Sequence, residues 1–313
     1  MLEAIALVGP TGVGKTEISL KLAELLHAEI ISADSMQVYR GMDIGTAKAT
    51  AAERARVPHH LLDLVNPDQP FSAAQYQQLA REAMADIHAR GKLPLLVGGT
   101  GLYVRAALEP YQFTPFSVDR DFRNSLQQRA QSEGAQVLLD ELAQVDAKAA
   151  AKLHVNDTRR IIRALEVYTY TGRQISATAA SREEAPLYRT VWLGLNRERS
   201  ELYQRIDKRV EAMFSEGLPQ EVQRLMGDGW GPDSIAGQAL GYKEMLAYLA
   251  GDMAKEDAMH IIQQGTRRYA KRQLSWFGRQ PHIMWTLLDE HSKAEQIAEK
   301  LAAYVHSQLQ HNA

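Results

Sequence analysis

One stretch near the start of the chain has the residue types and spacing of a phosphate-binding loop (P-loop), GxxxxGK[ST]. Its glycines let backbone N–H groups approach phosphate oxygens, and a helix that begins there adds its positive end. The lysine supplies a charge to the distal phosphates, and the next hydroxyl is placed to ligate Mg²⁺. The sequence therefore predicts a site for a di- or triphosphate group. The loop consists of Gly9, Pro10, Thr11, Gly12, Val13, Gly14, Lys15 and Thr16.

Acidic residues are scarce where a nucleotide-hydrolysing P-loop protein needs one. Such proteins hold Mg²⁺ with an Asp at the end of a second strand, but the strand expected at 94–99 runs into a Gly-Gly-Thr turn. The strand-terminal carboxylate nearest to the loop is Asp34. It could act as a general base toward an acceptor, or it could only form the turn before Ser35. Thr100 could orient the same acceptor or serve as a turn hydroxyl, so both alternatives stay open.

Basic side chains gather in three places, although the whole chain has a net charge of −2. The C-terminal group is interleaved with Tyr269, Trp276 and Phe277 and contains no acid. Such a mixture suits phosphate contacts and base stacking, but a solvated helix face with aromatics in the core would have the same composition. Three clusters on separate elements favour a polyanionic partner. The clusters are Arg267, Arg268, Lys271, Arg272 and Arg279; Arg159, Arg160 and Arg163; and Arg120, Arg123 and Arg129.

The first hundred residues alternate between strand and helix patterns. Apolar runs predict strands at 5–8, 29–34 and 94–99, and helical spacing predicts helices at 17–27 and 72–91. This alternation builds a parallel sheet with helices on both faces, whose ligands lie beyond the carboxyl ends of the strands. We therefore expect the turns that follow these strands to converge on one crevice. The three turns are 9–16, 34–37 and 98–101.

The pattern changes after about residue 112. Only helical signals run from Asp119 to Gly172, and strand-like runs return at 190–195 and 282–285. The sequence therefore predicts an α/β fold with a P-loop kinase-like parallel sheet core flanked by helices, interrupted by an all-helical insertion. The expected parts are 1–113 and 188–313 for the core and 114–187 for the insertion.

Composition narrows the function classes. The chain has 313 residues, 45% hydrophobic and 24% charged, as in an ordinary soluble globular protein. It has no cysteine, which excludes disulfides, thiolate catalysis and Cys-based metal sites. The first apolar run is too short for a membrane helix and lacks the features of a signal peptide, so we expect a cytoplasmic protein without a membrane partner. His59 and His60 have no acidic neighbours in sequence, which favours a structural role over a metal pair.

Seven ordered segments, spread from Gly9 to Trp276, resemble the tRNA dimethylallyltransferases of the bacterial type. The resemblance covers essentially the whole chain, and its motifs are long enough that a chance match is negligible. The segments are the P-loop, DSMQVYRGMDIGTAK (34–48), PHHL (58–61), GGTGLY (98–103), RRIIRALE (159–166), QALGYK (238–243) and KRQLSW (271–276).

By this resemblance, the chain would transfer a dimethylallyl group from dimethylallyl diphosphate to the exocyclic N6 amine of the adenosine just 3′ of the anticodon (position 37 of the tRNA). The tRNAs would be those that read codons starting with U, and pyrophosphate would leave from the P-loop. Bond breaking at carbon needs no water-positioning acid, which would explain the missing strand-end Asp. The resemblance implies that Asp34 accepts the amine proton and that Thr100 helps hold the adenine. Lys15, Thr16 with Mg²⁺, and Arg123 would steady the departing pyrophosphate.

We expect a monomer whose partner is the anticodon stem-loop of tRNA. A stacked adenine cannot reach such a site, so the target base must be flipped out. By resemblance, three segments contact the tRNA, together with Thr100 and Arg123. Relatives often carry Gln at the position of Arg159, a change that should be tolerated because both side chains donate hydrogen bonds. The segments are Asp34, Ser35, Met36 and Gln37; Arg159, Arg160, Ile161, Ile162 and Arg163; and Gln238, Ala239, Leu240, Gly241, Tyr242 and Lys243.

Three alternatives to tRNA prenylation can be weighed on the sequence. A free-nucleotide prenyltransferase of the cytokinin-forming kind shares the core but has no evident use for the helical insertion and the basic C-terminal cluster. A small-molecule kinase is suggested by the P-loop and the strand-end glycines, and it would consume ATP. A tRNA-binding protein without catalysis is disfavoured because the P-loop is intact.

Overall fold

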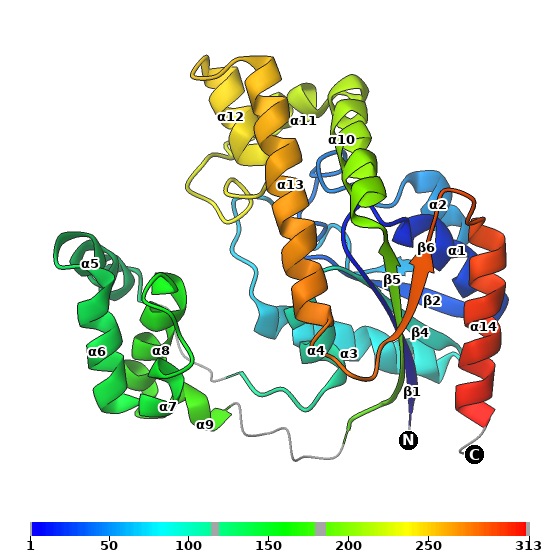
Figure 1. Cartoon of the computed structure of the whole chain (residues 1–313), viewed down its shortest axis with the longest axis horizontal. Helices are drawn as coiled ribbons and strands as arrows, with labels where there is room; N and C mark the ends of the chain where they lie inside the picture. Colours follow the sequence, from blue (N-terminus) through cyan, green and yellow to red (C-terminus); the bar gives the residue numbers. More distant parts are fainter. Residues whose placement is uncertain (1, 114–118, 179–185, 311–313) are drawn as a thin grey trace. The chain divides into compact units, whose positions relative to one another are not determined.

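The computed structural model divides into two compact units (Figure 1). The six strands that the structure describes all belong to one unit, and the other, drawn in green, contains only helices within its described part. The structure describes residues 2–113, 119–178 and 186–310. The sheet-containing unit comprises 1–109 and 187–313, and the helical unit comprises 110–186.

Six parallel strands form one sheet in the order β3-β2-β4-β1-β5-β6, with helices on both faces. This confirms the predicted α/β fold. Five strands lie at apolar runs that the sequence analysis selected, whereas β3 was not expected because two half-buried histidines carry no strand pattern. The strands are β1 (Glu3–Val8), β2 (Ala28–Ala33), β3 (His59–His60), β4 (Leu93–Gly98), β5 (Arg189–Arg197) and β6 (Met284–Leu288).

Helices cover both faces of the sheet because its central strands are apolar on both sides. In β1, Ala4, Ala6 and Val8 belong to the core beneath α3 and α4, while Ile5 and Leu7 belong to the core beneath α1 and α14. A parallel strand buried on both faces reads as a continuous apolar run, which explains the clear strand signal in the sequence. These helices are α1 (Lys15–Leu26), α3 (Ala73–Ala89), α4 (Gly101–Leu108) and α14 (Ala294–Gln310).

The strand register brings the three predicted turns to the same level. Val8 of β1 and Ala33 of β2 both lie opposite Gly98 of β4. The three strands therefore end in one row, and the chain leaves the sheet at the same edge each time. Ligands of parallel sheets bind at this carboxyl edge, so the register itself assembles the candidate site.

Later helices extend the first core beyond the sheet. Phe214 of α10, Val222 of α11, Tyr242 of α12 and Ile262 of α13 belong to the same buried cluster as the apolar residues of α3 and α4. The long α13, orange in Figure 1, runs from α12 to α4. The remaining helices of this unit are α2 (Ala51–Arg56), α10 (Arg199–Glu216), α11 (Leu218–Gly227), α12 (Tyr242–Ala250) and α13 (Lys255–Phe277).

The helical unit has a small core of its own, made by apolar residues of α5, α6, α7 and α8. Two of its predicted boundaries are confirmed. The Asp119 side chain accepts the N–H groups of Asp121 and Phe122 at the start of α5, and Gly172 ends α8 with a left-handed φ of 66°. Its helices are α5 (Arg120–Ser132), α6 (Ala135–Val145), α7 (Ala147–Ala150), α8 (Thr158–Thr171) and α9 (Ile175–Thr178).

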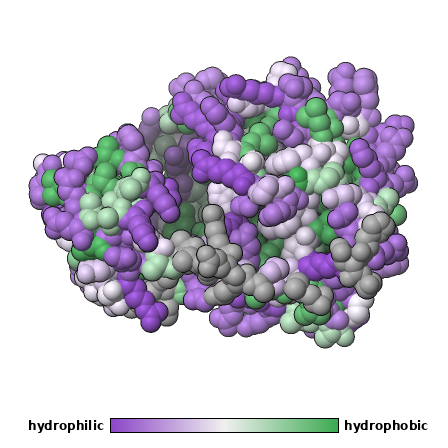
Figure 2. All heavy atoms as spheres, turned by 60° about the horizontal axis from the view of Figure 1, so that its bottom comes forward, coloured by the Kyte–Doolittle hydropathy of each residue, from purple (hydrophilic) through white to green (hydrophobic). Residues whose placement is uncertain are grey.

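The surface carries isolated apolar side chains. Figure 2 shows hydrophilic and hydrophobic residues interspersed over one face of the molecule. Large exposed apolar residues come from different elements, such as Leu25 of α1, Met226 of α11 and Leu287 of β6. No helix in the described ranges combines the length and the apolar character needed to cross a membrane.

A buried carboxylate holds one edge of the sheet. Glu29 of β2 is 1% exposed and accepts hydrogen bonds from Arg90 Nη2 (2.8 Å), Lys92 Nζ (2.8 Å) and His60 Nε2 of β3 (2.7 Å). The Arg90 guanidinium, followed by the other two donors, holds the pKa of Glu29 well below its usual range, although burial acts in the opposite direction. The cluster ties β3 and the start of β4 to β2.

We expect Glu29→Gln to lower the free energy of unfolding at pH 7 by about 2 kcal/mol, the scale of a hydrogen bond to a charged group. Because the folded-state pKa is depressed, the carboxylate contributes fully above its unfolded pKa of about 4.3 and loses that contribution as the pH falls below it. Urea unfolding followed by circular dichroism at pH 7 and at about pH 3 measures both effects. Glu24→Gln, a carboxylate paired with Arg56 at the surface, is the matched control. An equal difference between wild type and Glu29→Gln at both pH values would contradict this account.

Candidate phosphate and acceptor site

The P-loop joins the carboxyl end of β1 to the first turn of α1. Gly12 and Gly14 have φ values of 80° and 109°, which glycine adopts without strain. Helix α1 begins at Lys15, so the N–H groups of its first turn have no partner within the helix and can bind an anion. A Cβ at Gly9 would lie 2.5 Å from the carbonyl oxygen of Leu195 in β5, so only glycine fits there. The loop therefore has the backbone of a phosphate cradle.

Lys15 is folded back onto this loop. Its Nζ donates to the carbonyl oxygens of Gly9 (2.9 Å) and Pro10 (2.8 Å). Removal of the ammonium from water lowers the pKa of Lys15 to about 7; the Asp34 carboxylate opposes this shift, and the Arg209 charge adds to it. A phosphate in the loop would supply negative charge that favours the protonated lysine.

Two arginines that the sequence analysis did not select support the loop from outside. Arg205 of α10 donates through Nε to the carbonyl of Gly12 (3.0 Å), and Arg197 at the end of β5 donates through Nε to the carbonyl of Val13 (3.0 Å). Both bonds engage carbonyl groups and occupy none of the loop N–H groups. The two side chains thus fix the loop's shape without filling its anion site.

A third arginine, Arg209, lies near both Lys15 and Asp34. Burial lowers the pKa of Arg209, and the charge of Asp34 works against that shift. Within the part of the chain that the structure describes, its guanidinium forms no hydrogen bond or ion pair, so its donors are available to an anion. No motif marks this residue in the sequence, because it is one of several arginines on an amphipathic helix whose contact with the P-loop exists only in the fold.

Asp34 is the first residue after β2, at the same edge of the sheet. Its Oδ1 accepts the N–H of Met36 (2.9 Å), the one hydrogen bond that the carboxylate forms with the described residues. The N–H of Ser35 donates to Thr100 Oγ1 (3.1 Å), and the N–H of Thr100 donates to the carbonyl of Ala33 (3.1 Å). The two interpretations of Asp34 are therefore compatible, since one oxygen shapes the turn and the other is left for an acceptor.

Three tyrosines surround Asp34. The rings of Tyr76 and Tyr103 are stacked with their centroids 3.9 Å apart, and Tyr269 of α13 hydrogen-bonds to Thr100. Burial raises the pKa of all three hydroxyls, to about 12 for Tyr269, and the charge of Asp34 adds to each shift. All three stay neutral at physiological pH. Tyr76 and Tyr103 are buried in the core behind Asp34, and only the half-buried Tyr269 leaves part of its ring for a planar acceptor.

The buried amide of Gln273 in α13 joins the P-loop to the glycine turn after β4. Its Oε1 accepts the N–H of Thr11 (2.8 Å), and its Nε2 donates to the carbonyl of Gly99 (3.0 Å). A Cβ at Gly99 would lie 1.9 Å from that Nε2, and a Cβ at Gly101 would lie 2.3 Å from the ring of Trp276. The strand-end glycines are therefore needed because α13 packs directly on the turn. Gln273 lies in one of the family-like segments, but its residue type and spacing alone indicated no role.

Each interpretation of the C-terminal basic cluster describes one side of α13. Its aromatic side packs on the turn after β4, as an ordinary core-facing stripe would. On its other side, Arg268, Lys271 and Arg272 are exposed, while Arg267 is paired with Asp207. A basic surface is therefore present, made by fewer residues than the sequence cluster contains.

The structure corrects the predicted tRNA-contact segments in part. Ala239, Tyr242, Ile161 and Ile162 are between 0% and 7% exposed and belong to the cores of their units, so their side chains do not offer surface to an RNA. When a family motif is transferred as a whole segment, it includes the helix residues that face the core. Surface contact in these segments is left to their exposed or half-buried members, which are Gln238, Leu240, Lys243, Arg159, Arg160 and Arg163.

In the helical unit, Arg123 forms a two-bond ion pair with Glu166, from Nε (2.6 Å) and Nη2 (2.8 Å). Glu166 is fully buried, and this pair raises the pKa of Arg123. The guanidinium is thus held in a fixed orientation with part of its edge exposed. Its role toward pyrophosphate stays a prediction.

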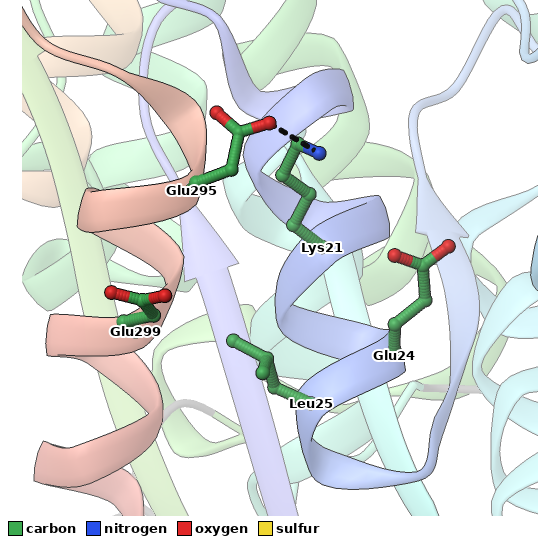
Figure 3. A pocket seen from close by; sticks show the side chains of 5 residues that line it. All are labelled: Lys21, Glu24, Leu25, Glu295 and Glu299. Carbon is green, nitrogen blue, oxygen red and sulfur yellow. Dashed lines mark ion pairs between the residues drawn. The ribbon is translucent and has the colours of Figure 1, made fainter.

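A surface pocket between α1 and α14 is a separate feature (Figure 3). Lys21 is paired there with Glu295 (2.6 Å), and Glu24, Leu25 and Glu299 complete the lining. Three carboxylates against one lysine do not suit a phosphate. The pocket lies on later turns of α1 than the P-loop, so it plays no part in the candidate site.

Few protein side chains at this site could act as metal ligands. The described residues contain no group of three or more His, Asp or Glu side chains that could hold a metal ion. Thr16 lies in the first turn of α1, directly beside the anion site. A donor set of one hydroxyl next to phosphate oxygens and water fits Mg²⁺, which usually keeps waters and binds through substrate phosphates.

We expect pyrophosphate binding to take up a proton on Lys15. At pH 8 a lysine with a pKa of about 7 is mostly neutral, and the bound phosphate favours its charged form, so uptake approaches about one proton. Titration calorimetry in buffers of different ionisation enthalpy measures this number. In Lys15→Arg the side chain stays charged and the uptake should be lost. Equal uptake by both proteins would rule out Lys15 as its source.

A second variant tests the bridge between the P-loop and the glycine turn. Gln273→Ala leaves the Thr11 N–H and the Gly99 carbonyl without their partner, which should weaken pyrophosphate binding about tenfold, the equivalent of one hydrogen bond of roughly 1.4 kcal/mol. Calorimetric dissociation constants measure the effect. Gln264→Ala, an exposed glutamine on the same helix, should bind as wild type does. Unchanged affinity in Gln273→Ala would show that the loop keeps its shape without the bridge.

Comparison with known proteins places these features in a family. Residues 37–280 match the IPP transferase family. The chain is 51% identical over 286 residues, 91% of this chain and 92% of the relative, to a tRNA dimethylallyltransferase of Desulforudis audaxviator.

Two solved structures agree with this match. A tRNA isopentenylpyrophosphate transferase of Bacillus halodurans superposes with a TM-score of 0.72 at 44% identity, covering 100% of both chains. A eukaryotic dimethylallyltransferase acting on tRNA superposes with a TM-score of 0.83 at 30% identity, covering 100% of this chain and 80% of the other. The chain therefore belongs to the IPP transferase family.

Proposed function

We propose that this chain transfers a dimethylallyl group from dimethylallyl diphosphate to the N6 amine of the adenosine 3′ of the anticodon, in tRNAs that read codons starting with U. The observation that carries the proposal is a complete P-loop near the carboxylate of Asp34, which could receive the proton of an acceptor. The neighbouring strand β4 ends in glycines and not in an acid that could position a hydrolytic water. Family membership and the names of the relatives support the same activity.

The chemistry follows from the charges around the P-loop. The bond between the allylic carbon and the diphosphate oxygen breaks, and its electron pair leaves with pyrophosphate. Lys15, Arg209 and the loop N–H groups stabilise the negative charge that grows on this leaving group. A bound Mg²⁺, held at Thr16 and by the phosphates, would add positive charge at the same place.

The acceptor side completes the reaction. The amine nitrogen forms the new bond to the allylic carbon, and its proton passes to the free oxygen of Asp34. Thr100 Oγ1 accepts the N–H of Ser35, the residue after Asp34. Its hydroxyl would hold the edge of the adenine. The tyrosines beside Asp34 exclude water, which would otherwise compete for the electrophilic carbon.

The tRNA would meet the protein through charged and polar residues of three segments. Arg159, Arg160 and Arg163 of the helical unit suit backbone phosphates of the anticodon stem-loop, as does Lys243 of the sheet-containing unit. The adenosine must leave the stacked loop to reach Asp34. We assign Arg123 to the departing pyrophosphate by family resemblance alone. We further propose that the enzyme acts as a monomer in the cytoplasm, where tRNA is available.

The alternatives identified from the sequence are less consistent with these features. A kinase would use the P-loop for ATP and would need its Mg²⁺ shell completed by a strand-end acid. A free-nucleotide prenyltransferase leaves the exposed arginines of α8 and α13 without a function. Neither alternative is favoured by a specific observation.

Replacement of the acceptor-side base tests the proposal. Asp34→Asn keeps the oxygen that binds the Met36 N–H but cannot take the amine proton, so transfer should slow by about 10²–10⁴-fold while tRNA affinity is kept. The assay incubates labelled dimethylallyl diphosphate and Mg²⁺ with unmodified tRNA or with AMP. Asp68→Asn, at an exposed acid, is the control variant.

For the wild type we expect label in tRNA and none in AMP. Label in AMP alone would support the free-nucleotide enzyme, and label in neither, with ATP consumption, would support a kinase. Near-normal transfer by Asp34→Asn would remove its role as base.

A further inference from the structure

A buried carboxylate outside the site joins two of the predicted tRNA-contact regions. Glu221 of α11 is 4% exposed. Its Oε2 accepts the backbone N–H groups of Asp43 (3.0 Å) and Ile44 (2.7 Å). Its Oε1 accepts the N–H of Gly45 (3.3 Å) and the hydroxyl of Tyr242 (2.6 Å). Among the residues that the structure describes, no cation pairs with Glu221, so neutral donors alone compensate its charge.

Burial of the Glu221 carboxylate is energetically unfavourable unless its hydrogen bonds offset the lost hydration. Moving an ionised carboxylate out of water costs several kcal/mol, which hydrogen bonds must offset. An apolar side chain would fill the same space in the core without that cost, but it could not bind three successive backbone N–H groups. Glu221 therefore fixes the position of the loop 43–48, which packing alone would not do.

The same loop is also bound by Gln37. Gln37 Nε2 donates to the carbonyls of Thr46 (3.2 Å) and Ala47 (3.3 Å), and its Oε1 accepts the hydroxyl of Ser32 (2.8 Å). The amide of a residue predicted to contact tRNA is thus used within the protein. Through it, the loop 43–48 is tied to the turn that carries Asp34.

A third connection is made by the last residue of the loop. Lys48 has a fully buried side chain whose Nζ donates to the carbonyl of Tyr39 (2.7 Å) and pairs with Asp43 (2.7 Å) and Asp63 (2.6 Å). The loop is therefore held at both ends and at its centre. Such a loop has little freedom to reorder when a ligand arrives.

The last connection leads to the segment 238–243. A Cβ at Gly45 would lie 2.5 Å from the ring of Tyr242, so the ring packs directly on the loop backbone. Tyr242 also meets Trp230 edge-on, with ring centroids 6.0 Å apart. It is the first residue of α12 and lies between the two exposed residues of that segment, Gln238 and Lys243. The position of that segment thus depends on the Tyr242–Glu221 contact.

We propose that Glu221 is a positioning residue for tRNA, which holds segments 34–37 and 238–243 at a fixed spacing through the loop 43–48 and Tyr242. This inference rests on the proposed function. A preordered surface avoids the entropy cost of ordering loops on binding. The P-loop is supported by other residues, Gln273, Arg197 and Arg205, so loss of the Glu221 contacts should weaken tRNA binding and leave diphosphate binding intact.

The test compares two ligands on four variants of the full chain. Glu221→Gln keeps the size of the side chain and removes its charge, and Tyr242→Phe removes only the hydroxyl. Each should weaken tRNA binding about tenfold, the equivalent of one hydrogen bond, with pyrophosphate binding within about twofold of wild type. The double variant should be little worse than either single one, since both act on one contact. Glu211→Gln, at an exposed acid on α10, is the control.

Filter binding of unmodified tRNA and calorimetry with pyrophosphate provide the two constants. Equal weakening of both ligands would overturn the proposal in favour of a general structural role, as would unchanged tRNA affinity in Tyr242→Phe, the variant that keeps the packed ring. If Glu221→Gln does not fold, Tyr242→Phe decides alone. The transfer assay on wild type is independent of these constants. Absence of transfer together with selective loss of tRNA binding would refute the proposed function and leave the positioning role standing.

Discussion

The candidate site depends on the level at which three parallel strands end. One residue of β4, Gly98, is opposite the last residues of both β1 and β2. A slip of one residue would shift a turn by about 3.3 Å and turn its side chains to the other face of the sheet. The bonds from Ser35 to Thr100 and from Thr100 to Ala33 would then be lost. Apolar strands packed on both faces hold this register, so the two hydrophobic cores determine where the P-loop and Asp34 meet.

Elements from the last third of the chain complete the site that the first hundred residues begin. Helix α10 contributes cations around the P-loop, and α13 contributes Gln273 and Tyr269, which contact the loop and the Thr100 turn. The first strands and turns therefore form an anion site, while the later helices determine its charge and its rigidity. This order explains why a common P-loop core can serve a carbon electrophile in place of a nucleotide.

Local signals predicted the fold, and they selected residues that the structure brings to one edge of the sheet. The P-loop, the strand ends and the helix starts are encoded by neighbouring residues, so Lys15, Asp34 and Thr100 could be selected from the sequence. Arg209 and Glu221 could not, because the groups around them come from distant parts of the sequence and neither residue type nor spacing marks them.

The buried isoleucines of α8 show the opposite error. A family motif includes them, but helical periodicity places Ile161 and Ile162 with Leu165 on the core side. Similarly, the edge strand β3 has no apolar pattern, since its pairing with β2 and the hydrogen bond between His60 and Glu29 hold it in place of packing. Motifs identify segments, and only packing identifies which side chains of a segment are accessible.

The close approach of α13 to the glycine turn has a consequence for how such a chain can change over time. Any side chain at Gly99 or Gly101 would overlap Gln273 or Trp276, and a smaller residue at position 273 would break the bridge to Thr11 before space was gained. A substitution at Gly99, Gly101 or Gln273 is therefore not tolerated unless the residue that it contacts has already changed. The turn and the helix are therefore expected to be inherited as one unit, although 174 residues separate Gly99 from Gln273 in the sequence.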